Sequence, residues 1–286
     1  MRLFVFGLGY TAERFVDTFV GRFTNVSCTV RRAERLNTQT CVDADVYTFN
    51  ATVHAADIEQ RVSEADAILV SVPPARFEDP VLSVFGQLLR RSAARRIVYL
   101  SSIGVYGDHG GAWIDELTSA VPNTDRGKAR RRAEVEWRDT VGDRLAILRL
   151  AGIYGLGRDP FVNLRAGRAR RIVKPGQVLN RIHVDDAGRA ITRAFEISTG
   201  GTWNVCDDEP APPQDVIAYA ASLMNVRPPP EEDFSNCQMT AMARSFYEAN
   251  NRINNARLKT ELGVSLLFPN YREGLRAIWT PGAQHR

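Results

Sequence analysis

The sequence predicts an α/β fold built on a doubly wound parallel sheet with helices on both faces. Leu3 to Phe6 is a short apolar run without polar alternation, which is typical of a strand buried on both sides, and further candidate strands recur along the first 150 residues. Segments with apolar residues at helical spacing separate these runs, and strands that alternate with helices indicate parallel pairing. The expected strands lie at residues 3–6, 26–30, 46–49, 67–72, 96–101 and 145–150.

Length and composition limit the class of protein. With 286 residues, 44% of them hydrophobic, the chain can form one large domain or a domain with a smaller lobe. No apolar run reaches the roughly 20 residues of a membrane span, and Glu13 and Arg14 interrupt the N-terminal segment too early for a signal peptide. We therefore expect a cytoplasmic protein without membrane contact. Its four cysteines lack metal-ligand spacing and are expected to be reduced thiols: Cys28, Cys41, Cys206 and Cys237.

The net charge of +4 is carried almost entirely by arginine, since Lys128, Lys174 and Lys259 are the only lysines. A basic chain raises the question of a nucleic-acid surface. The arginines are spread along the chain, however, and aromatic residues do not interleave with them. This pattern favours a codon preference for arginine, and we expect a small-molecule substrate and no nucleic-acid partner.

Gly7, Gly9 and Ala12 follow the first expected strand at the spacing of a dinucleotide fingerprint. The first glycine allows a tight strand-to-helix turn, the second lets a pyrophosphate approach the backbone, and the small third residue lets the helix pack on the strand. The helix that follows would direct free N–H groups and its dipole at the phosphates. The motif thus predicts a dinucleotide site, with a simple glycine turn as the alternative.

Arg31 and Arg32 follow the second expected strand, at about the distance where the ribose-reading residue of such sites falls. An acidic residue there would bind the 2′-hydroxyl and favour NAD. Guanidinium groups instead suit a 2′-phosphate, so the hypothesis is a preference for NADP, with NAD possible. The alternative is two solvated loop arginines.

Residues 1–155 are expected to form the dinucleotide-binding domain, which also receives about 180–205. Residues 156–286 are expected to form mainly a small α/β substrate lobe. Pro73 and Pro74 end the fourth strand, because proline cannot continue a hydrogen-bonded ladder. Helices are expected at 80–91, 126–139, 213–224 and 251–262 and from near Asp186, with a strand at 203–205.

Six motifs in order resemble the extended short-chain dehydrogenase/reductase family, the NAD(P)-dependent epimerase/dehydratase group. They are GLGYTA from Gly7, YLSSIGVYG at 99–107, LRLAGIYGLGR at 148–158, NRIHVDDAGRA at 180–190, GTWNVCDDEP at 201–210 and RINNARLKTELG at 252–263. The resemblance implies a Rossmann-type fold and an oxidoreductase or epimerase/dehydratase acting on a carbonyl or nucleotide-sugar-like substrate. It also implies a homodimer formed through the helix at 126–139.

The family uses a serine or threonine, a tyrosine and a lysine for catalysis, and Ser102 matches the serine by position. The segment at 122–134, PNTDRGKARRRAE, aligns with the family pattern PxxxYGxxKxxxE. Arg126 then stands in place of the tyrosine and Arg130 in place of the lysine. Arginine is essentially never neutral, so Arg126 is a poor acid or base at pH 7, and the chain resembles the atypical, tyrosine-lacking members of the family.

Three explanations for the missing tyrosine remain open. Tyr106 supplies the phenol, or it only packs in the turn of the VYG run. Alternatively Arg126 clamps an anionic group of substrate or cofactor, and an anion between it and Arg130 offsets their repulsion. The third possibility is a non-catalytic NAD(P)-binding sensor or regulatory protein.

The positions that match the family's motifs define the full set of expected site residues. The catalytic residues expected are Ser102, Tyr106, Arg126 and Arg130. The cofactor residues expected are Gly7, Gly9, Tyr10, Thr11, Ala12, Arg31, Arg32, Ser71, Val72, Pro73, Ser101, Arg130, Ala151 and Ile153. The substrate residues expected are Pro74, Ser102, Arg158, Arg181 and His183, although a buried, hydrogen-bonded role is preferred over a catalytic one for His183.

Overall fold

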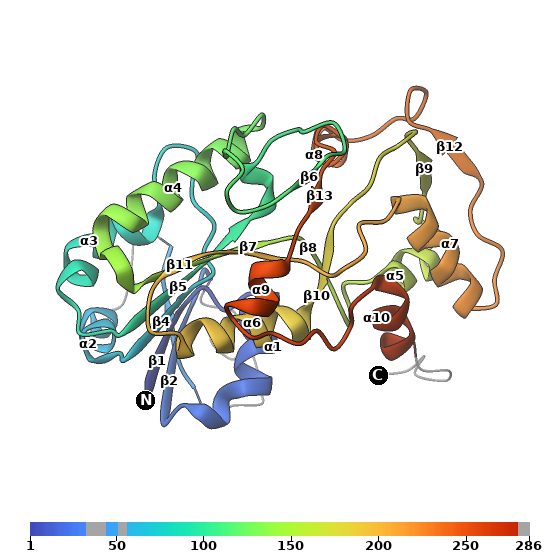
Figure 1. The fold of residues 1–286 in the computed structure, drawn as a ribbon. Helices are drawn as coiled ribbons and strands as arrows, with labels where there is room; N and C mark the ends of the chain where they lie inside the picture. The colour runs from blue at the N-terminus through green and yellow to red at the C-terminus, as the bar shows by residue number, and fades with distance from the viewer. Residues whose placement is uncertain (33–43, 51–55, 280–286) are drawn as a thin grey trace.

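A seven-stranded parallel sheet forms the centre of the molecule in a computed structural model that describes residues 1–32, 44–50 and 56–279 (Figure 1). The spatial order is β11-β7-β5-β4-β1-β2-β3, so it reverses between β1 and β4, where open α/β sheets bind ligands. The predicted fold class is confirmed. The strands are β1 (Arg2–Phe6), β2 (Asn25–Val30), β3 (Asp45–Thr48), β4 (Ala67–Val70), β5 (Arg96–Ser102), β7 (Leu145–Leu150) and β11 (Gly201–Val205).

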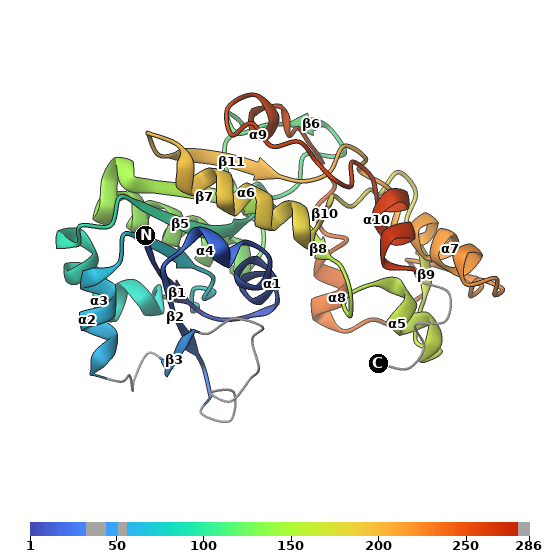
Figure 2. The ribbon, with the colours of Figure 1, turned by 90° about the horizontal axis from the view of Figure 1, so that it is seen from below.

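Helices cover both faces of the sheet (Figure 2). Leu3 and Val5 of β1 pack in the core under α1 (Tyr10–Phe19) and α6 (Val184–Glu196). Phe4 and Phe6 point to the opposite core. Each face of the strand is therefore buried, which explains the apolar run without alternation. The helices of the second face are α2 (Asp57–Glu64), α3 (Pro80–Arg91) and α4 (Asp125–Val141).

A second, smaller set of elements lies beside the sheet in Figure 1. Its paired strands are β8 (Gly152–Tyr154) with β10 (Arg181–His183), and β9 (Arg171–Val173) with β12 (Glu231–Asp233). Its helices are α5 (Pro160–Arg165), α7 (Pro213–Leu223), α8 (Ala241–Ser245) and α10 (Tyr271–Ile278). Aromatic and aliphatic side chains of β8, α5, α7 and α10 form a core of their own. No helix in the described ranges is long and apolar enough to cross a membrane.

The helix predicted over 251–262 is wrong in its first half. Residues Arg252–Ile253 form β13, which pairs with β6 (Trp113–Ile114), and only Ala256–Thr260 is helical, as α9. Asparagine side chains explain the difference, because they bind backbone groups that a helix would use. The Asn254 Oδ1 accepts the Ala256 N–H at 2.7 Å, for example.

Several other element boundaries differ from the predicted ones by one or two residues. The fourth strand ends at Val70, two residues before its predicted end, although the Ser71 and Val72 N–H groups both still donate to the Phe6 carbonyl. Helix α6 begins at Val184, ahead of Asp186, because the His183 Nδ1 accepts the Asp185 N–H and caps it. These differences are small shifts at element ends.

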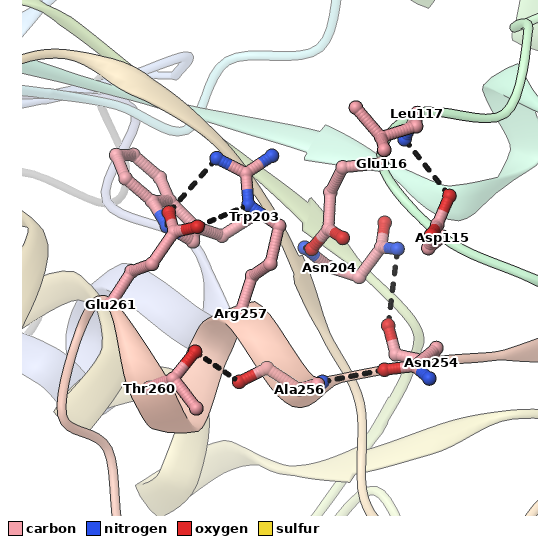
Figure 3. A network of polar contacts seen from close by, with 10 residues as sticks. All are labelled: Asp115, Glu116, Leu117, Trp203, Asn204, Asn254, Ala256, Arg257, Thr260 and Glu261. Carbon is pink, nitrogen blue, oxygen red and sulfur yellow. Dashed lines mark hydrogen bonds and ion pairs between the residues drawn. The ribbon is translucent and has the colours of Figure 1, made fainter.

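Strand β11 lies at one edge of the sheet, and side chains of two other segments make polar contacts with it (Figure 3). The Glu116 carboxylate accepts the Asn204 N–H at 2.7 Å, so a free edge donor is satisfied. On the other side Glu261 of the α9 end accepts the Trp203 indole N–H at 3.0 Å and pairs with Arg257. These contacts make the β11 edge less available to a further strand.

A buried ion pair joins α4 to the sheet. Glu134 is 1% exposed, and its Oε2 lies 2.7 Å from the Nη2 of Arg149 on β7. The same carboxylate accepts the Ser101 hydroxyl of β5 at 2.7 Å. Burial opposes the charge on Arg149, but the hydrogen bonds and charge of Glu134 outweigh it and raise the Arg149 pKa. The pair therefore fixes the distance between α4 and the strands β5 and β7.

Replacing Glu134 with Gln is expected to lower the free energy of unfolding by about 3–5 kcal/mol, because Arg149 would stay buried without its counter-ion. Urea unfolding followed by circular dichroism measures the change. The matched control is Glu136→Gln on the same helix, whose carboxylate pairs with Arg132 at 3.8 Å in a partly exposed position. This control should cost less than about 1 kcal/mol. Equal losses for the two variants would contradict the assignment.

Candidate functional site

The turn between β1 and α1 has the geometry of a phosphate cradle. Gly7 adopts φ +90°, and a Cβ at this residue would lie 2.8 Å from the Val72 Cγ2, so only glycine fits. A Cβ at Gly9 would meet nothing within 4 Å, which leaves the backbone there open to a ligand. Ala12 is fully buried, as its predicted packing role requires. The residues present therefore fit a pyrophosphate at the N-terminus of α1.

Tyr10 connects this turn to the loop after β8. Its hydroxyl donates to the Leu156 carbonyl at 3.1 Å, and the Arg158 guanidinium lies 5.7 Å from its ring centroid. Burial raises the pKa of Tyr10 to about 12, so the phenol stays protonated near neutrality. Thr11, the next predicted contact, is buried at 7% exposure. Of these two residues, Tyr10 is the one that contacts the loop after β8.

The ends of β2 and β4 border the glycine turn on its two sides. The Gly7 N–H donates to the Thr29 Oγ1 at 2.8 Å and the Leu8 N–H to the Thr29 carbonyl at 2.7 Å. Arg31 and Arg32 follow closely and are both exposed. On the β4 side the chain continues into Ser71, Val72, Pro73 and Pro74, of which Pro73 is exposed and the others are half-buried.

The two serines at the end of β5 have different surroundings. The Ser101 hydroxyl is buried and committed to Glu134. Ser102 is half-buried, and its Oγ accepts the Gly104 N–H at 3.1 Å. Because an oxygen accepting one hydrogen bond still has a proton to donate, Ser102 is the serine that can bind a ligand oxygen. Ser101, predicted as a cofactor contact, has its side chain directed into the protein.

Helix α4 begins close to this serine. A Cβ at Gly127 would lie 2.5 Å from the Gly104 carbonyl oxygen, so glycine permits the close approach of the helix to the turn at Ile103–Val105. Arg126 is exposed in the first turn of α4. Arg130 is half-buried, and its Nη1 donates to the Leu100 carbonyl at 2.6 Å. An exposed cation and an anchored cation therefore lie one turn apart on this helix.

Tyr106 is fully buried, so its phenol is not presented at the surface. The hydroxyl donates to the Asn204 Oδ1 at 2.8 Å, and the Arg149 guanidinium lies 4.8 Å from the ring centroid. Burial raises the pKa of this phenol above its ordinary value. Of the two roles considered for Tyr106, these contacts are those of a packing residue.

A cavity of about 490 Å³ lies in the smaller lobe, and it brings together Arg158 and Arg181 of the predicted substrate residues. Pro74 and His183 do not line it. Burial lowers the pKa of His183 to about 4, so the imidazole is neutral, and its ring packs between Tyr154 and Phe268. The other lining residues are Tyr154, Gly157, Asp159, Pro160, Val162, Asn163, Arg170, Pro213, Val216, Ile217, Tyr271 and Leu275.

Comparison with known proteins places this site in a family. No model of a known protein family matches the chain. It is, however, 30% identical over 303 residues to the 3-diazoavenalumate denitrifying reductase of a Streptomyces species, covering 96% of this chain and 99% of that protein. The human epimerase family protein SDR39U1 (isoform 2), solved with NADPH, has the same fold at a TM-score of 0.76 and 16% identity over 97% of this chain and 99% of that one. The chain belongs to the extended short-chain dehydrogenase/reductase family.

A third match is nearer in sequence. A functionally unknown conserved protein from Silicibacter pomeroyi DSS is 41% identical, with a TM-score of 0.87 and 97% of each chain covered. The family is one of NAD(P)-dependent epimerases and reductases. The sequence resemblance predicts that Arg126 and Arg130 replace its tyrosine and lysine, and both arginines lie in the first two turns of α4.

Several residues that shape the site were not singled out from the sequence. Arg149 is one, and its signal was a charge inside the otherwise apolar run at 145–150. Glu134 is another, and it closes the family pattern at 122–134. The aromatic walls of the cavity, Tyr154 and Tyr271, gave no such signal, because they are separated by more than a hundred residues of chain.

The two glycines of the turn should respond differently to a Cβ. We expect Gly7→Ala to lower the free energy of unfolding by about 1–3 kcal/mol, since alanine at φ +90° is strained and meets Val72. Gly9→Ala should cost about 1 kcal/mol or less, because its Cβ has open space. Thermal and urea unfolding of both variants measure this. A Gly9 variant less stable than the Gly7 variant would contradict the geometry.

Proposed function

We propose that this protein is an NADP-dependent oxidoreductase that reduces a small organic substrate. The observation that carries the proposal is the open cradle at Gly9, beside two exposed arginines at the end of β2. The cradle suits a pyrophosphate, and Arg31 and Arg32 suit the 2′-phosphate that distinguishes NADP from NAD. The reductase from Streptomyces, related over almost the full length, supports reduction as the reaction type.

The residues around the cradle would hold the rest of the cofactor. Backbone N–H groups at the start of α1 would bind the pyrophosphate, and the ends of β4 and β7 would flank the nicotinamide half. Arg130 would supply positive charge near the ribose in place of the family's lysine. When bound, the nicotinamide supplies a hydride. The predicted contacts on these strand ends are Ser71, Val72, Pro73, Ala151 and Ile153.

On the substrate side the chain offers a hydroxyl and a fixed positive charge. Ser102 would bind an oxygen atom of the substrate, and Arg126 would stabilise negative charge that develops next to it. Arg126 cannot deliver a proton, because a guanidinium stays charged at every physiological pH. This part of the site is therefore suited to stabilising an anion, and any proton would come from solvent.

The name of the Streptomyces relative describes a reduction that removes nitrogen from a diazo compound. In a reaction of that kind the nitrogen leaves with the electron pair of the C–N bond, so no oxygen atom has to be protonated by a tyrosine. We propose that this chain likewise acts on a substrate whose reduction needs no proton donor from the protein. A nucleotide-sugar epimerisation, which needs a base and an acid in turn, suits the site less well.

A non-catalytic NADP-binding sensor is the second candidate, and Arg126 in place of tyrosine is the observation that favours it. Such a protein would bind NADPH tightly and consume none. The two candidates separate in one experiment, in which NADPH binding and NADPH oxidation are followed with the same preparation across a panel of carbonyl, quinone and aryl-diazonium compounds.

Replacing Arg31 and Arg32 together with Ser should weaken NADPH binding at least about tenfold and NADH binding less than about threefold, because charge-assisted contacts to the 2′-phosphate are lost. Fluorescence titration of the full-length protein measures both dissociation constants.

Two controls make this test specific. Arg227→Ser removes an exposed charge in the other lobe and should change neither constant. Gly9→Ala should weaken both cofactors alike, since it narrows the cradle that they share. A wild-type protein that binds NADH more tightly than NADPH would overturn the assignment of NADP.

Tyr106→Phe should lower the free energy of unfolding by about 1–2 kcal/mol, because the buried Asn204 Oδ1 loses its donor. NADPH consumption per folded molecule should not change. Arg126→Gln should show the opposite pattern. NADPH consumption should fall about tenfold or more, and the free energy of unfolding should change by no more than about 0.5 kcal/mol. If Tyr106→Phe folds and abolishes turnover, the phenol is the proton donor and the role given to Arg126 fails.

A further inference from the structure

The cavity in the smaller lobe contains two arginines that lack a counter-ion. Among the residues that the structure describes, no carboxylate lies within ion-pair distance of Arg158 or Arg181. The third arginine of the wall, Arg170, does have a counter-ion. Its Nε donates to the Glu232 Oε1 at 3.0 Å. A partly buried charge without a counter-ion is costly, so a ligand would gain through Arg181, and the exposed Arg158 offers a second guanidinium without a carboxylate partner.

Arg181 is held in place by its neighbours. Its Nη1 donates to the Leu179 carbonyl at 2.8 Å and to the Ala211 carbonyl at 3.0 Å, and the remaining guanidinium nitrogens make no described hydrogen bond. The nearby acidic group, Asp207, is 2% exposed, and burial raises its pKa to about 8. Asp207 is the main acidic group acting on Arg181, but its own burial opposes its negative charge.

The rest of the wall is mainly apolar or aromatic. Tyr154 and Tyr271 contribute rings, and Val162, Val216 and Leu275 contribute aliphatic side chains. The Tyr154 hydroxyl is buried against Gly274, where a Cβ would lie 2.0 Å away, so it does not serve as a hydrogen-bonding group of the cavity. A ligand with a flat apolar body matches these surfaces.

Neutral polar groups are scarce in this cavity. Asn163 is the amide of the wall, and the Asp159 carboxylate already accepts the N–H groups of Gly157 and Val162. A sugar or a nucleoside would bring many hydroxyl groups that find no partner here, and each unpaired group costs free energy. The wall therefore offers few partners for the hydroxyl groups of a nucleotide sugar.

We propose that this cavity binds an aromatic or conjugated carboxylate, with the carboxylate on Arg181 and Arg158 and the flat body against the apolar wall to which Tyr154 and Tyr271 contribute. Bidentate pairing of guanidinium with carboxylate is among the strongest polar contacts in proteins. The identification of this ligand as the substrate rests on the proposed reductase function.

The position of Arg158 links the cavity to the cofactor cradle. The Arg158 guanidinium lies over the Tyr10 ring, and Tyr10 begins the helix that follows Gly9. A carboxylate on Arg158 would thus lie beside the end of the cavity that faces the glycine turn. The apolar part of the ligand would then extend toward α7 and α10, whose residues form the far wall.

Calorimetric titration of the full-length protein tests the proposal with three probes: cinnamate, the uncharged cinnamamide and UDP-glucose. Cinnamate should bind at least about tenfold more tightly than cinnamamide, because only the acid pairs with the arginines. UDP-glucose should bind more weakly than cinnamate. Equal affinity for acid and amide, no binding of cinnamate, or tighter binding of UDP-glucose would each overturn the proposal.

Arg181→Gln and Arg158→Gln should each reduce cinnamate affinity about tenfold and leave cinnamamide affinity unchanged. Arg158 is exposed, so its variant tests the idea even if the Arg181 variant fails to fold. The control Arg165→Gln removes one positive charge from α5, outside the cavity, and should leave the affinity for cinnamate unchanged. NADPH binding to the same variants separates the two ideas, since loss of cinnamate binding alone would leave the cofactor assignment intact.

Discussion

The buried contact between Glu134 and Arg149 is the constraint on which the arrangement of the site depends. One carboxylate holds Ser101 of β5, Arg149 of β7 and, through its own backbone, the helix that carries Arg126 and Arg130. Arg149 in turn lies against the Tyr106 ring. Because breaking such a pair leaves a bare charge inside the protein, the serine turn and the helix are fixed relative to each other before any ligand binds.

The site has two parts that meet at one loop. The glycine turn and the ends of β2 and β4 form the part for the dinucleotide, and the cavity among β8, α5, α7 and α10 forms the other. The loop after β8 belongs to both, through Leu156 and Arg158 on Tyr10. Because one loop contacts both parts, its conformation affects the shape of the glycine turn and of the cavity together.

The sequence was sufficient for the parts of the fold that local chemistry decides. Gly7 was predicted at a turn that tolerates only glycine, and the apolar runs became buried parallel strands. It was insufficient where distant residues compete. The helix expected from residue 251 was shortened because Asn254 and its neighbours bind backbone groups, some of them far along the chain. Likewise Arg158 and Arg181 were expected at the substrate, but the walls around them come from segments as far apart as 154 and 275.

The anchored state of Arg130 has a structural consequence. Its guanidinium donates to the Leu100 carbonyl and lies 5.9 Å from the Tyr99 ring centroid, so its charge is already engaged by the protein. A hydrogen bond to a carbonyl leaves the guanidinium charged, and this charge opposes the burial that raises the pKa of the Tyr99 phenol. The side chain at position 130 is therefore constrained by the packing of β5 as well as by any ligand. Substitutions there are expected to be limited by folding before they are limited by activity.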